Sequence, residues 1–227
     1  TEEVMQRLDN GANIIFMLGH YGNWEWMVVT RLYFKKEKYV GAAIYKRIRN
    51  KYVDEFYLKL RSRFNILCIE KNSVFREIVR QRKLEKQMAM ALISDQTPSK
   101  KNIHYWTEFL NQDTPFLTGG ERMARQTNYE LFYVDIQKKK RGYYEADLVL
   151  LHDDVKNTPE FMLTEKFARM MEQTILREPA YWLWTHKRWK HKRNNIHTHL
   201  FVCRNSLKLF FHEVQRFLSH FLYYLKI

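Results

Sequence analysis

Short apolar runs alternate with helical patterns through the first hundred residues of this 227-residue chain. Runs of apolar residues bounded by turn residues predict strands at residues 13–18, 39–46, 64–70 and 88–94. Between them, apolar residues at helical spacing predict helices at 23–36, 50–62 and 73–86. This alternation is typical of a mostly parallel central sheet flanked by helices on both faces, so the sequence predicts an α/β fold.

The pattern changes in the second half of the chain. Two close strands are predicted at 129–137 and 143–151, joined by the segment from Lys138 to Gly142, and this indicates an antiparallel hairpin. The four cations that precede Gly142 are expected to be solvated at the tip of the hairpin.

Two more helices are predicted at 119–127 and 159–177. Pro159 suits the first turn of the second helix, and Thr158 suits its cap. Glu121 is expected to be a first-turn carboxylate that favours the start of its helix.

The composition is that of a folded domain. Hydrophobic residues make up 45% and aromatic residues 15% of the chain, which is ample for a sizeable core and argues against disorder. Cys68 and Cys203 provide no disulfide framework and suit a reducing compartment. No run of 18 apolar residues occurs, so the sequence itself predicts no membrane-spanning helix.

A second pattern begins at Asn194. Apolar residues from Leu207 to Leu225 fall at helical spacing with polar residues between them, which predicts an amphipathic helix. Its apolar stripe either packs onto the domain or lies in a membrane interface. We therefore divide the chain into a domain at 1–193 and a helical tail at 194–227. Because the chain begins at Thr1 rather than at a methionine, we expect a further segment upstream.

A histidine and a glutamate follow the first predicted strand, in the segment Gly19-His20-Tyr21-Gly22-Asn23-Trp24-Glu25. His20 is expected in the loop at the carboxyl end of the strand, where open α/β sheets bind ligands, with Glu25 in the next helical turn. An imidazole held by a carboxylate can take a proton from an alcohol. The alternative is a structural histidine and a glutamate that only favours the helix start.

This segment resembles the first motif of the bacterial lipid A biosynthesis lauroyl/myristoyl acyltransferases. That family belongs to the wider lysophospholipid and glycerolipid acyltransferases. Further blocks resemble the family in its own order, namely Tyr45-Lys46-Arg47 with Asn50 and Tyr52, Arg61-Ser62-Arg63-Phe64, Arg76, Asp95-Gln96-Thr97-Pro98, Phe109-Leu110-Asn111, Thr118-Gly119-Gly120-Glu121 and Trp182 to Lys190. The resemblance covers about residues 1–193, and the tail departs from it.

The resemblance implies an acyltransferase with a central sheet flanked by helices. It implies that His20 deprotonates a hydroxyl of a lipid A precursor while Glu25 orients and charges the ring. The hydroxyl then attacks the thioester of an acyl carrier protein, with no covalent enzyme intermediate, which fits the absence of a Gly-x-Ser-x-Gly motif. The alternative acceptor is another lyso-lipid, such as an aminolipid.

Other polar residues are candidates to bind the acceptor. Arginine makes bidentate bonds to phosphate and sugar-acid groups, and the candidates are Arg47, Arg61, Arg63 and Arg76. For each of them, a solvated surface position is the alternative. Asp95 follows a buried strand and is expected to bind a hydroxyl or to pair with one of these arginines, with Gln96 in the same site.

The backbone amides of Gly22 and Asn23, at the start of the predicted helix, are candidates to stabilise the oxyanion. Four histidines, His186, His191, His197 and His199, crowd into one basic tract, but they lack cysteine pairs and zinc spacing. We therefore expect neither a metal nor a cofactor, only acyl-acyl carrier protein as donor.

The net charge of +14 narrows the list of partners. So basic a surface attracts nucleic acid, anionic lipid or acidic protein. For an acyltransferase we expect acyl carrier protein and an anionic membrane surface rather than nucleic acid. The expected location is the cytoplasmic face of the bacterial inner membrane, with an anchor helix upstream of Thr1. The rival class is a non-catalytic basic module that binds nucleic acid or membrane.

Overall fold

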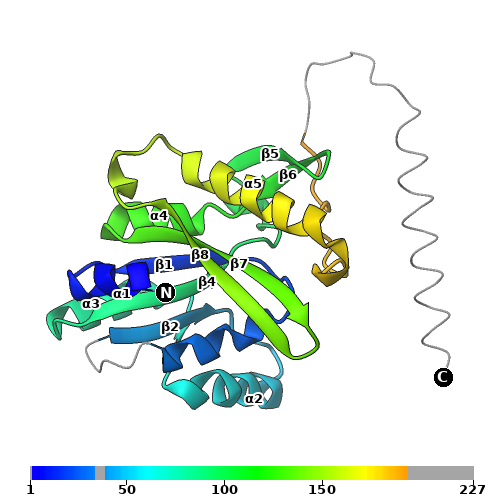
Figure 1. Ribbon diagram of the computed structural model, residues 1–227. Helices are drawn as coiled ribbons and strands as arrows, with labels where there is room; N and C mark the ends of the chain where they lie inside the picture. Colours follow the sequence, from blue (N-terminus) through cyan, green and yellow to red (C-terminus); the bar gives the residue numbers. More distant parts are fainter. Residues whose placement is uncertain (1, 34–38, 194–227) are drawn as a thin grey trace, which may run out of the picture. The chain divides into compact units, whose positions relative to one another are not determined.

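A six-stranded sheet forms the centre of the computed structural model, which describes residues 2–33 and 39–193 (Figure 1). The strand order is β3-β2-β4-β1-β7-β8, and all neighbours are parallel except β7 and β8. The strands are β1 (Ile14–Leu18), β2 (Tyr39–Tyr45), β3 (Leu67–Glu70), β4 (Gln87–Ile93), β7 (Glu130–Lys140) and β8 (Tyr143–His152). The predicted α/β fold with a mostly parallel sheet and a terminal hairpin is confirmed.

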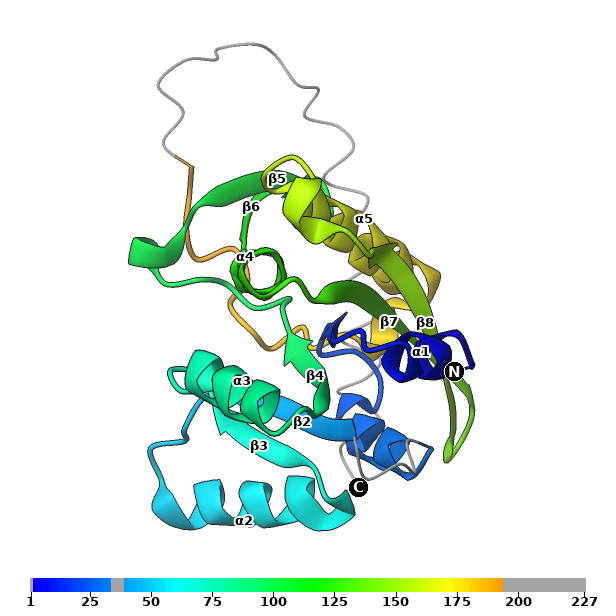
Figure 2. The same cartoon turned by 90° about the vertical axis from the view of Figure 1, so that its left-hand side faces the viewer.

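The connections place helices on both faces of the sheet. The α-helices are α1 (Glu2–Asp9), α2 (Lys51–Arg61), α3 (Val74–Lys83), α4 (Gly119–Thr127) and α5 (Met162–Arg177), and the 3₁₀-helices are η1 (Trp24–Leu32), η2 (Ser62–Phe64), η3 (Lys100–Asn102), η4 (Val155–Asn157) and η5 (Pro179–Tyr181). From β1 to β3 the chain adds strands toward one side of the sheet, and after β3 it adds them toward the other side. Because the crossovers are right-handed, η1 and α2 lie on one face of the sheet and α3 and α4 on the other. Figure 2 accordingly shows β2 and β3 between α2 and α3.

The centre of the sheet is β1, whose five residues are all buried. A continuous apolar run is typical of a parallel strand that is covered on both faces. The register pairs Leu18 at the end of β1 with Ile93 at the end of β4. The loops that follow these two strands therefore begin side by side, at the carboxyl edge of the sheet.

The helix predicted at 23–36 is instead the 3₁₀-helix η1, and residues 34–38 lie outside the described part of the chain. The residues Val28, Val29 and Thr30 are β-branched, which lowers the preference for an α-helix. The Thr30 hydroxyl also donates to the Met27 carbonyl, 2.6 Å away. A tight helix that covers one face of the sheet replaces the regular amphipathic one.

The predicted start of α5 is also wrong. The helix begins at Met162, after Phe161 in a left-handed conformation with φ of 64°. The Thr158 hydroxyl donates to the Val155 carbonyl at 2.8 Å, so it serves η4 and does not cap α5. Pro159 consequently lies before the helix rather than in its first turn.

Glu121 lies in the first turn of its helix, as predicted, and it is buried. Its Oε2 accepts from the Thr164 backbone N–H at 2.8 Å and from the Thr164 hydroxyl at 2.7 Å. Arg125 donates to its Oε1 at 3.2 Å. Glu121 therefore joins α4 to the first turn of α5.

Sequence patterns missed α1 and a second hairpin, β5 (Tyr105–Phe109) with β6 (Gln112–Phe116). The two turn residues, Leu110 and Asn111, both have positive φ, as a two-residue hairpin turn requires. Asn111 is the residue in the sequence that favours a turn here. Pro115 disfavours a strand at β6, because proline is rare within strands.

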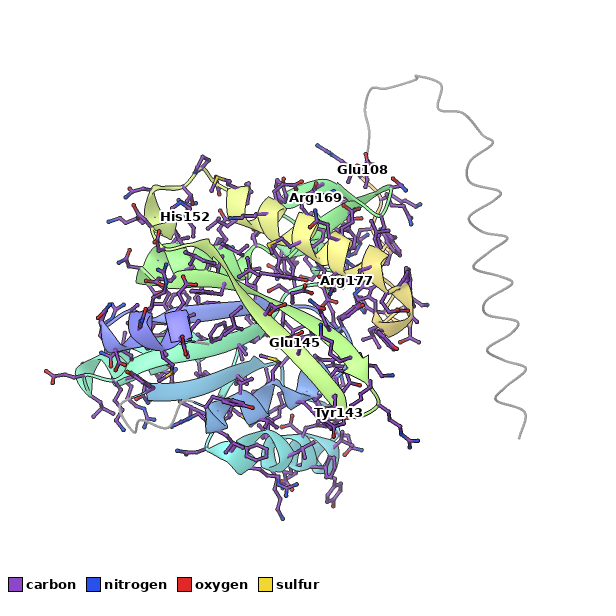
Figure 3. The ribbon with its side chains drawn as sticks, in the orientation of Figure 1. Glu108, Tyr143, Glu145, His152, Arg169 and Arg177 are labelled. Atoms are coloured by element: carbon purple, nitrogen blue, oxygen red, sulfur yellow. The ribbon has the colours of Figure 1, made fainter. Side chains whose placement is uncertain are left out.

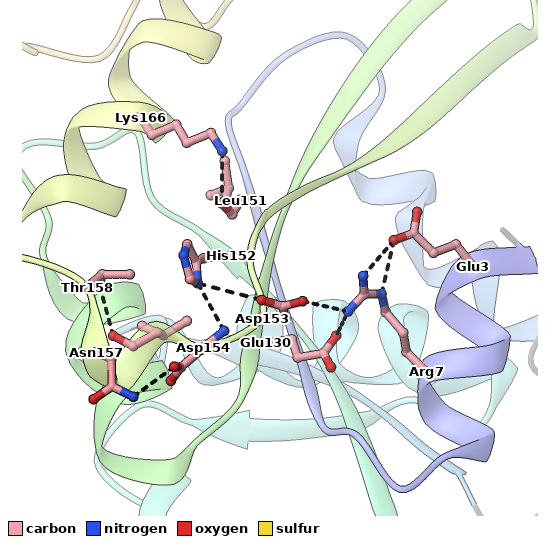
Figure 4. A network of polar contacts seen from close by, with 11 residues as sticks. Glu3, Arg7, Glu130, Leu151, His152, Asp153, Asp154, Asn157, Thr158 and Lys166 are labelled. Carbon is pink, nitrogen blue, oxygen red and sulfur yellow. Dashed lines mark hydrogen bonds and ion pairs between the residues drawn. The ribbon is translucent and has the colours of Figure 1, made fainter.

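An ion-pair network at the amino edge of the sheet fixes α1 (Figure 4). Arg7 pairs with Glu130 at the start of β7 at 3.1 Å, with Asp153 at 3.5 Å and with Glu3 at 3.0 Å. Burial raises the pKa of the Glu130 carboxyl above its ordinary value, although Arg7 opposes the shift. This network lies at the opposite edge of the sheet from the His20 loop.

Across residues 2–33 and 39–193, no helix is both long enough and apolar enough to cross a membrane. The amphipathic helix predicted within 194–227 lies outside the described residues.

Candidate active site

The backbone on both sides of Tyr21, directly after His20, is fixed by the segment that follows α5. The His20 carbonyl accepts from Leu183 N–H at 3.1 Å, and Gly22 N–H donates to the Tyr181 carbonyl at 2.9 Å. Gly22 has φ of 57°, a conformation in which glycine is the least strained residue. The Gly22 amide therefore already has a partner, which argues against the oxyanion role expected for it. Asn23 directly precedes η1.

Asp95 holds the imidazole of His20. Its Oδ1 lies 2.6 Å from His20 Nδ1, and its Oδ2 accepts from the His20 backbone N–H at 2.9 Å. Trp182 Nε1 donates to the same Oδ2 at 2.9 Å. The β1–β4 register explains the contact, because both residues follow paired strand ends.

Asp95 is buried, yet its carboxyl remains acidic. Burial alone would raise its pKa, but the hydrogen bonds from His20 and Trp182 and the charge of the imidazole bring the pKa below its ordinary value. An ionised carboxylate can only accept, so the proton between the two groups belongs on Nδ1 of the ring. Nε2 is then the unprotonated ring nitrogen, and the side-chain amide nitrogen of Gln96 lies within hydrogen-bond distance of it, at 3.3 Å.

Glu25 does not hold His20, contrary to our expectation. Its carboxylate makes a bidentate pair with Arg61 from the last turn of α2, with Nε–Oε2 and Nη2–Oε1 distances of 3.0 and 2.5 Å. The hydrogen bond to Glu25 raises the pKa of the Arg61 guanidinium, despite partial burial. Asp95, for which we expected an arginine or a hydroxyl as partner, occupies the position beside the imidazole instead.

A cavity of about 760 Å³ lies beneath η1 on one face of the sheet. His20, Glu25, Arg61 and Gln96 line its polar part. Most of the remaining wall is apolar and includes the small residues Gly41, Ala42, Ala43, Ala89, Ala91 and Ala146. These small side chains on β2, β4 and β8 leave room for a long apolar group next to His20.

The four predicted acceptor-binding arginines do not converge. Arg61 lines the cavity. Arg47 is exposed with its Nε 3.8 Å from Asp54, Arg63 is exposed on η2, and Arg76 is exposed on α3, on the other face of the sheet. The cavity wall also contains Arg31 and Lys46, which the sequence did not single out as binding residues.

The tryptophan-rich tract forms a support behind Asp95. Trp182 is buried and contacts the rings of Trp184 and Trp189 at centroid distances of 4.7 and 6.1 Å. Arg188 is 1% exposed and donates to the Pro115 carbonyl at 2.7 Å. Burial lowers the pKa of its guanidinium to about 10. Part of this basic tract is therefore internal.

Within the described ranges, no three histidine, cysteine or acidic side chains are arranged to hold a metal ion.

An α/β fold whose histidine–aspartate pair lies at a cavity with a largely apolar wall has the arrangement of a candidate active site. The chain belongs to the bacterial lipid A biosynthesis acyltransferase family, whose model matches residues 1–191. No curated protein matches the chain. The resemblance stated from the sequence is confirmed, and family membership makes the protein an acyltransferase of lipid A biosynthesis.

Proposed function

We propose that this acyltransferase moves a fatty acyl chain from acyl carrier protein to a hydroxyl of a lipid A precursor, with His20 as general base. The observation that carries the proposal is the position of His20 on the cavity wall, with Asp95 bound to its Nδ1. This arrangement leaves Nε2 to act on a substrate held in the cavity.

The proposed reaction has one tetrahedral intermediate. His20 Nε2 takes the proton of the acceptor hydroxyl as the oxygen attacks the thioester carbonyl. When the intermediate collapses, the carbon–sulfur bond breaks and the imidazolium returns the proton to the leaving thiolate. Asp95 stabilises the imidazolium in between, because its carboxylate is ionised and 2.6 Å from Nδ1.

An oxyanion donor is also needed. Because Gly22 N–H is engaged with Tyr181, we assign this role to the side-chain amide of Gln96, which lies beside Nε2. The backbone amide of Asn23 is the second candidate.

The apolar part of the cavity suits the acyl chain of the donor. Its floor includes one glycine and several alanines from β2, β4 and β8, and η1 covers it. Burying a methylene group contributes about 0.8 kcal/mol. The binding free energy of an acyl chain in this cavity would therefore depend on the number of buried methylene groups rather than on specific polar contacts.

The acceptor is proposed to bind where charge is concentrated at the polar end. Arg61 is held in place by Glu25, and Arg31 and Lys46 contribute further positive charge to the same wall. Fixed guanidinium groups bind phosphate through bidentate hydrogen bonds, as a phosphorylated lipid head requires. We also propose that the enzyme binds acidic acyl carrier protein and acts at the cytoplasmic face of the inner membrane. The net charge of +14 supports both, because it attracts acidic proteins and anionic lipids.

Mass spectrometry of lipid products tests this function. Wild-type protein with acyl-acyl carrier protein and a lipid A precursor should yield a product heavier by one acyl group. His20→Ala should abolish the product, while His152→Ala, a matched change outside the cavity wall, should not. If the wild type acylates no lysolipid, the enzyme proposal is wrong and the basic binding module is favoured.

A further inference from the structure

Helix α2 presents large apolar side chains to solvent. Tyr52 is 82% exposed, Phe56 is 63% exposed and Val53 is 39% exposed. Tyr52 and Phe56 are one helical turn apart, so they project from the same side of α2. Large exposed apolar groups that cluster in this way mark an interaction surface.

Cations surround these side chains. The exposed ones are Lys46, Arg47, Arg49, Lys51, Lys59 and Arg63. Only two carboxylates occur between Lys46 and Arg63. Asp54 is buried and accepts from the Ile48 backbone N–H at 2.8 Å, and Glu55 pairs with Lys51 at 3.7 Å. The surface, which we call the α2 face (residues 46–63), therefore has a clear excess of positive charge.

The α2 face is continuous with the wall of the catalytic cavity. Lys46, Ile48 and Arg61 all line the cavity, and they flank the exposed residues of α2 in sequence. The helix begins shortly after β2 ends, at the same edge of the sheet as His20. A molecule that rests on the α2 face is thus adjacent to the polar part of the cavity wall.

We propose that the α2 face docks onto an anionic lipid bilayer. Tyr52 and Phe56 enter the interfacial region, where aromatic side chains are favoured, and the surrounding cations contact the phosphates of anionic headgroups. Such a combination of exposed apolar residues and a lysine- and arginine-rich border is what interfacial helices use. The inference rests on the proposed function in one respect, since it explains how a membrane-resident acceptor reaches the cavity.

Helix α3 provides a matched comparison. Phe75 and Val79 are also exposed, at 49% and 52%, and are also one turn apart. They lie on the opposite face of the sheet from η1 and α2 (Figure 2), and neither lines the cavity. The position of the α2 face beside the cavity is what distinguishes it from α3.

Vesicle co-sedimentation of the full chain, without acyl donor, tests the proposal. The probes are phosphatidylcholine vesicles with and without phosphatidylglycerol. Wild type should bind the anionic vesicles, and raised salt should weaken binding. Tyr52→Ser/Phe56→Ser should reduce the partition coefficient by about tenfold or more, since two apolar side chains are lost from the interface. Phe75→Ser/Val79→Ser should change it less than about twofold, and the circular dichroism of both variants should match wild type.

Equal binding by wild type and the α2 double variant would overturn the proposal, as would a loss confined to the α3 variant. Loss of binding to acyl carrier protein with vesicle binding unchanged would assign the α2 face to a protein partner and also overturn it. The vesicle assay involves no turnover, so His20→Ala should bind as wild type does. Failure of docking is thereby distinguishable from failure of the acyl-transfer proposal.

Discussion

At the scale of single residues, the site depends on an ionised carboxylate buried beside an imidazole. Asp95 accepts hydrogen bonds from the His20 backbone, the His20 ring and Trp182, and these contacts compensate for its desolvation. A neutral residue of the same shape would keep the packing but would not stabilise an imidazolium. The charge of Asp95 is thus the property to remove experimentally.

Asp95→Asn should lower kcat by roughly 10²–10⁴-fold, the usual contribution of general acid–base catalysis. KM for the lipid acceptor should stay close to that of wild type, because Asp95 is not among the residues that line the cavity. Steady-state acyl transfer measures both parameters. An unchanged kcat would contradict the role we assign to Asp95.

Glu25→Gln should act differently, because Glu25 holds Arg61 and not His20. We expect KM for the lipid acceptor to rise by about tenfold, as the guanidinium loses its charged partner, with kcat close to that of wild type. Glu145→Gln is the control, since Glu145 pairs with Lys139 on the exposed β7–β8 hairpin (Figure 3). A loss of kcat in Glu25→Gln as large as that in Asp95→Asn would restore the original assignment of Glu25 as the orienting residue.

At the scale of elements, the loops after β1 and β4 meet because Leu18 pairs with Ile93. Sequence patterns predicted both strands and identified His20 and Asp95 as polar residues at their ends. They did not predict the contact, because strand order is a tertiary property that periodicity does not encode. Glu25 lay nearer to His20 in sequence and was therefore assigned to it.

Glu121→Ala should destabilise the junction of α4 and α5. The change leaves the Thr164 backbone N–H without its buried acceptor and frees Arg125 from its partner. We expect a loss of about 2–4 kcal/mol in the free energy of unfolding, measured by urea denaturation. Glu160→Ala, at an exposed position between η4 and α5, should cost less than about 0.5 kcal/mol. Equal losses in the free energy of unfolding for the two variants would show that the Glu121 contacts do not stabilise the fold.

Tyr129, which precedes β7, should make stability depend on alkaline pH. Burial raises the pKa of its phenol from 10.0 to about 12. A raised pKa stabilises the folded state below pH 10, and this contribution is lost as pH rises from 10 to 12. Tyr129→Phe should reduce the pH dependence of unfolding over that window by an amount on the order of 1–3 kcal/mol. Identical pH profiles for the two proteins would contradict the burial argument.

At the scale of the whole described domain, a parallel sheet covered on both faces creates the cavity. Small residues from β2, β4 and β8 form its floor, and η1 closes it. The sequence showed these alanines only as parts of apolar strands, and nothing in their spacing separates a cavity floor from a packed core. The cavity exists because the 3₁₀-helix η1 lies above these alanines and does not fill the space over them.

Ala91→Leu should shorten the acyl chain that the enzyme prefers. Ala91 lines the cavity from β4, so a larger side chain occupies space that the distal methylenes would fill. Competition between donors of different chain length, read by mass spectrometry, should favour the shorter chain by about tenfold or more. Ala91→Ser, of similar size, should keep the wild-type preference. Unaltered selectivity in Ala91→Leu would place the acyl chain elsewhere.

The central claim is that the His20 imidazole activates the acceptor hydroxyl inside this cavity. Single-turnover acyl transfer tests it most directly, with His20→Ala compared with wild type at saturating acyl-acyl carrier protein and lipid acceptor. We predict that the first-order rate constant falls by at least about a hundredfold, while acceptor binding and the thermal unfolding midpoint stay close to those of wild type. A His20→Ala enzyme that transfers the acyl group at the wild-type rate would contradict the account.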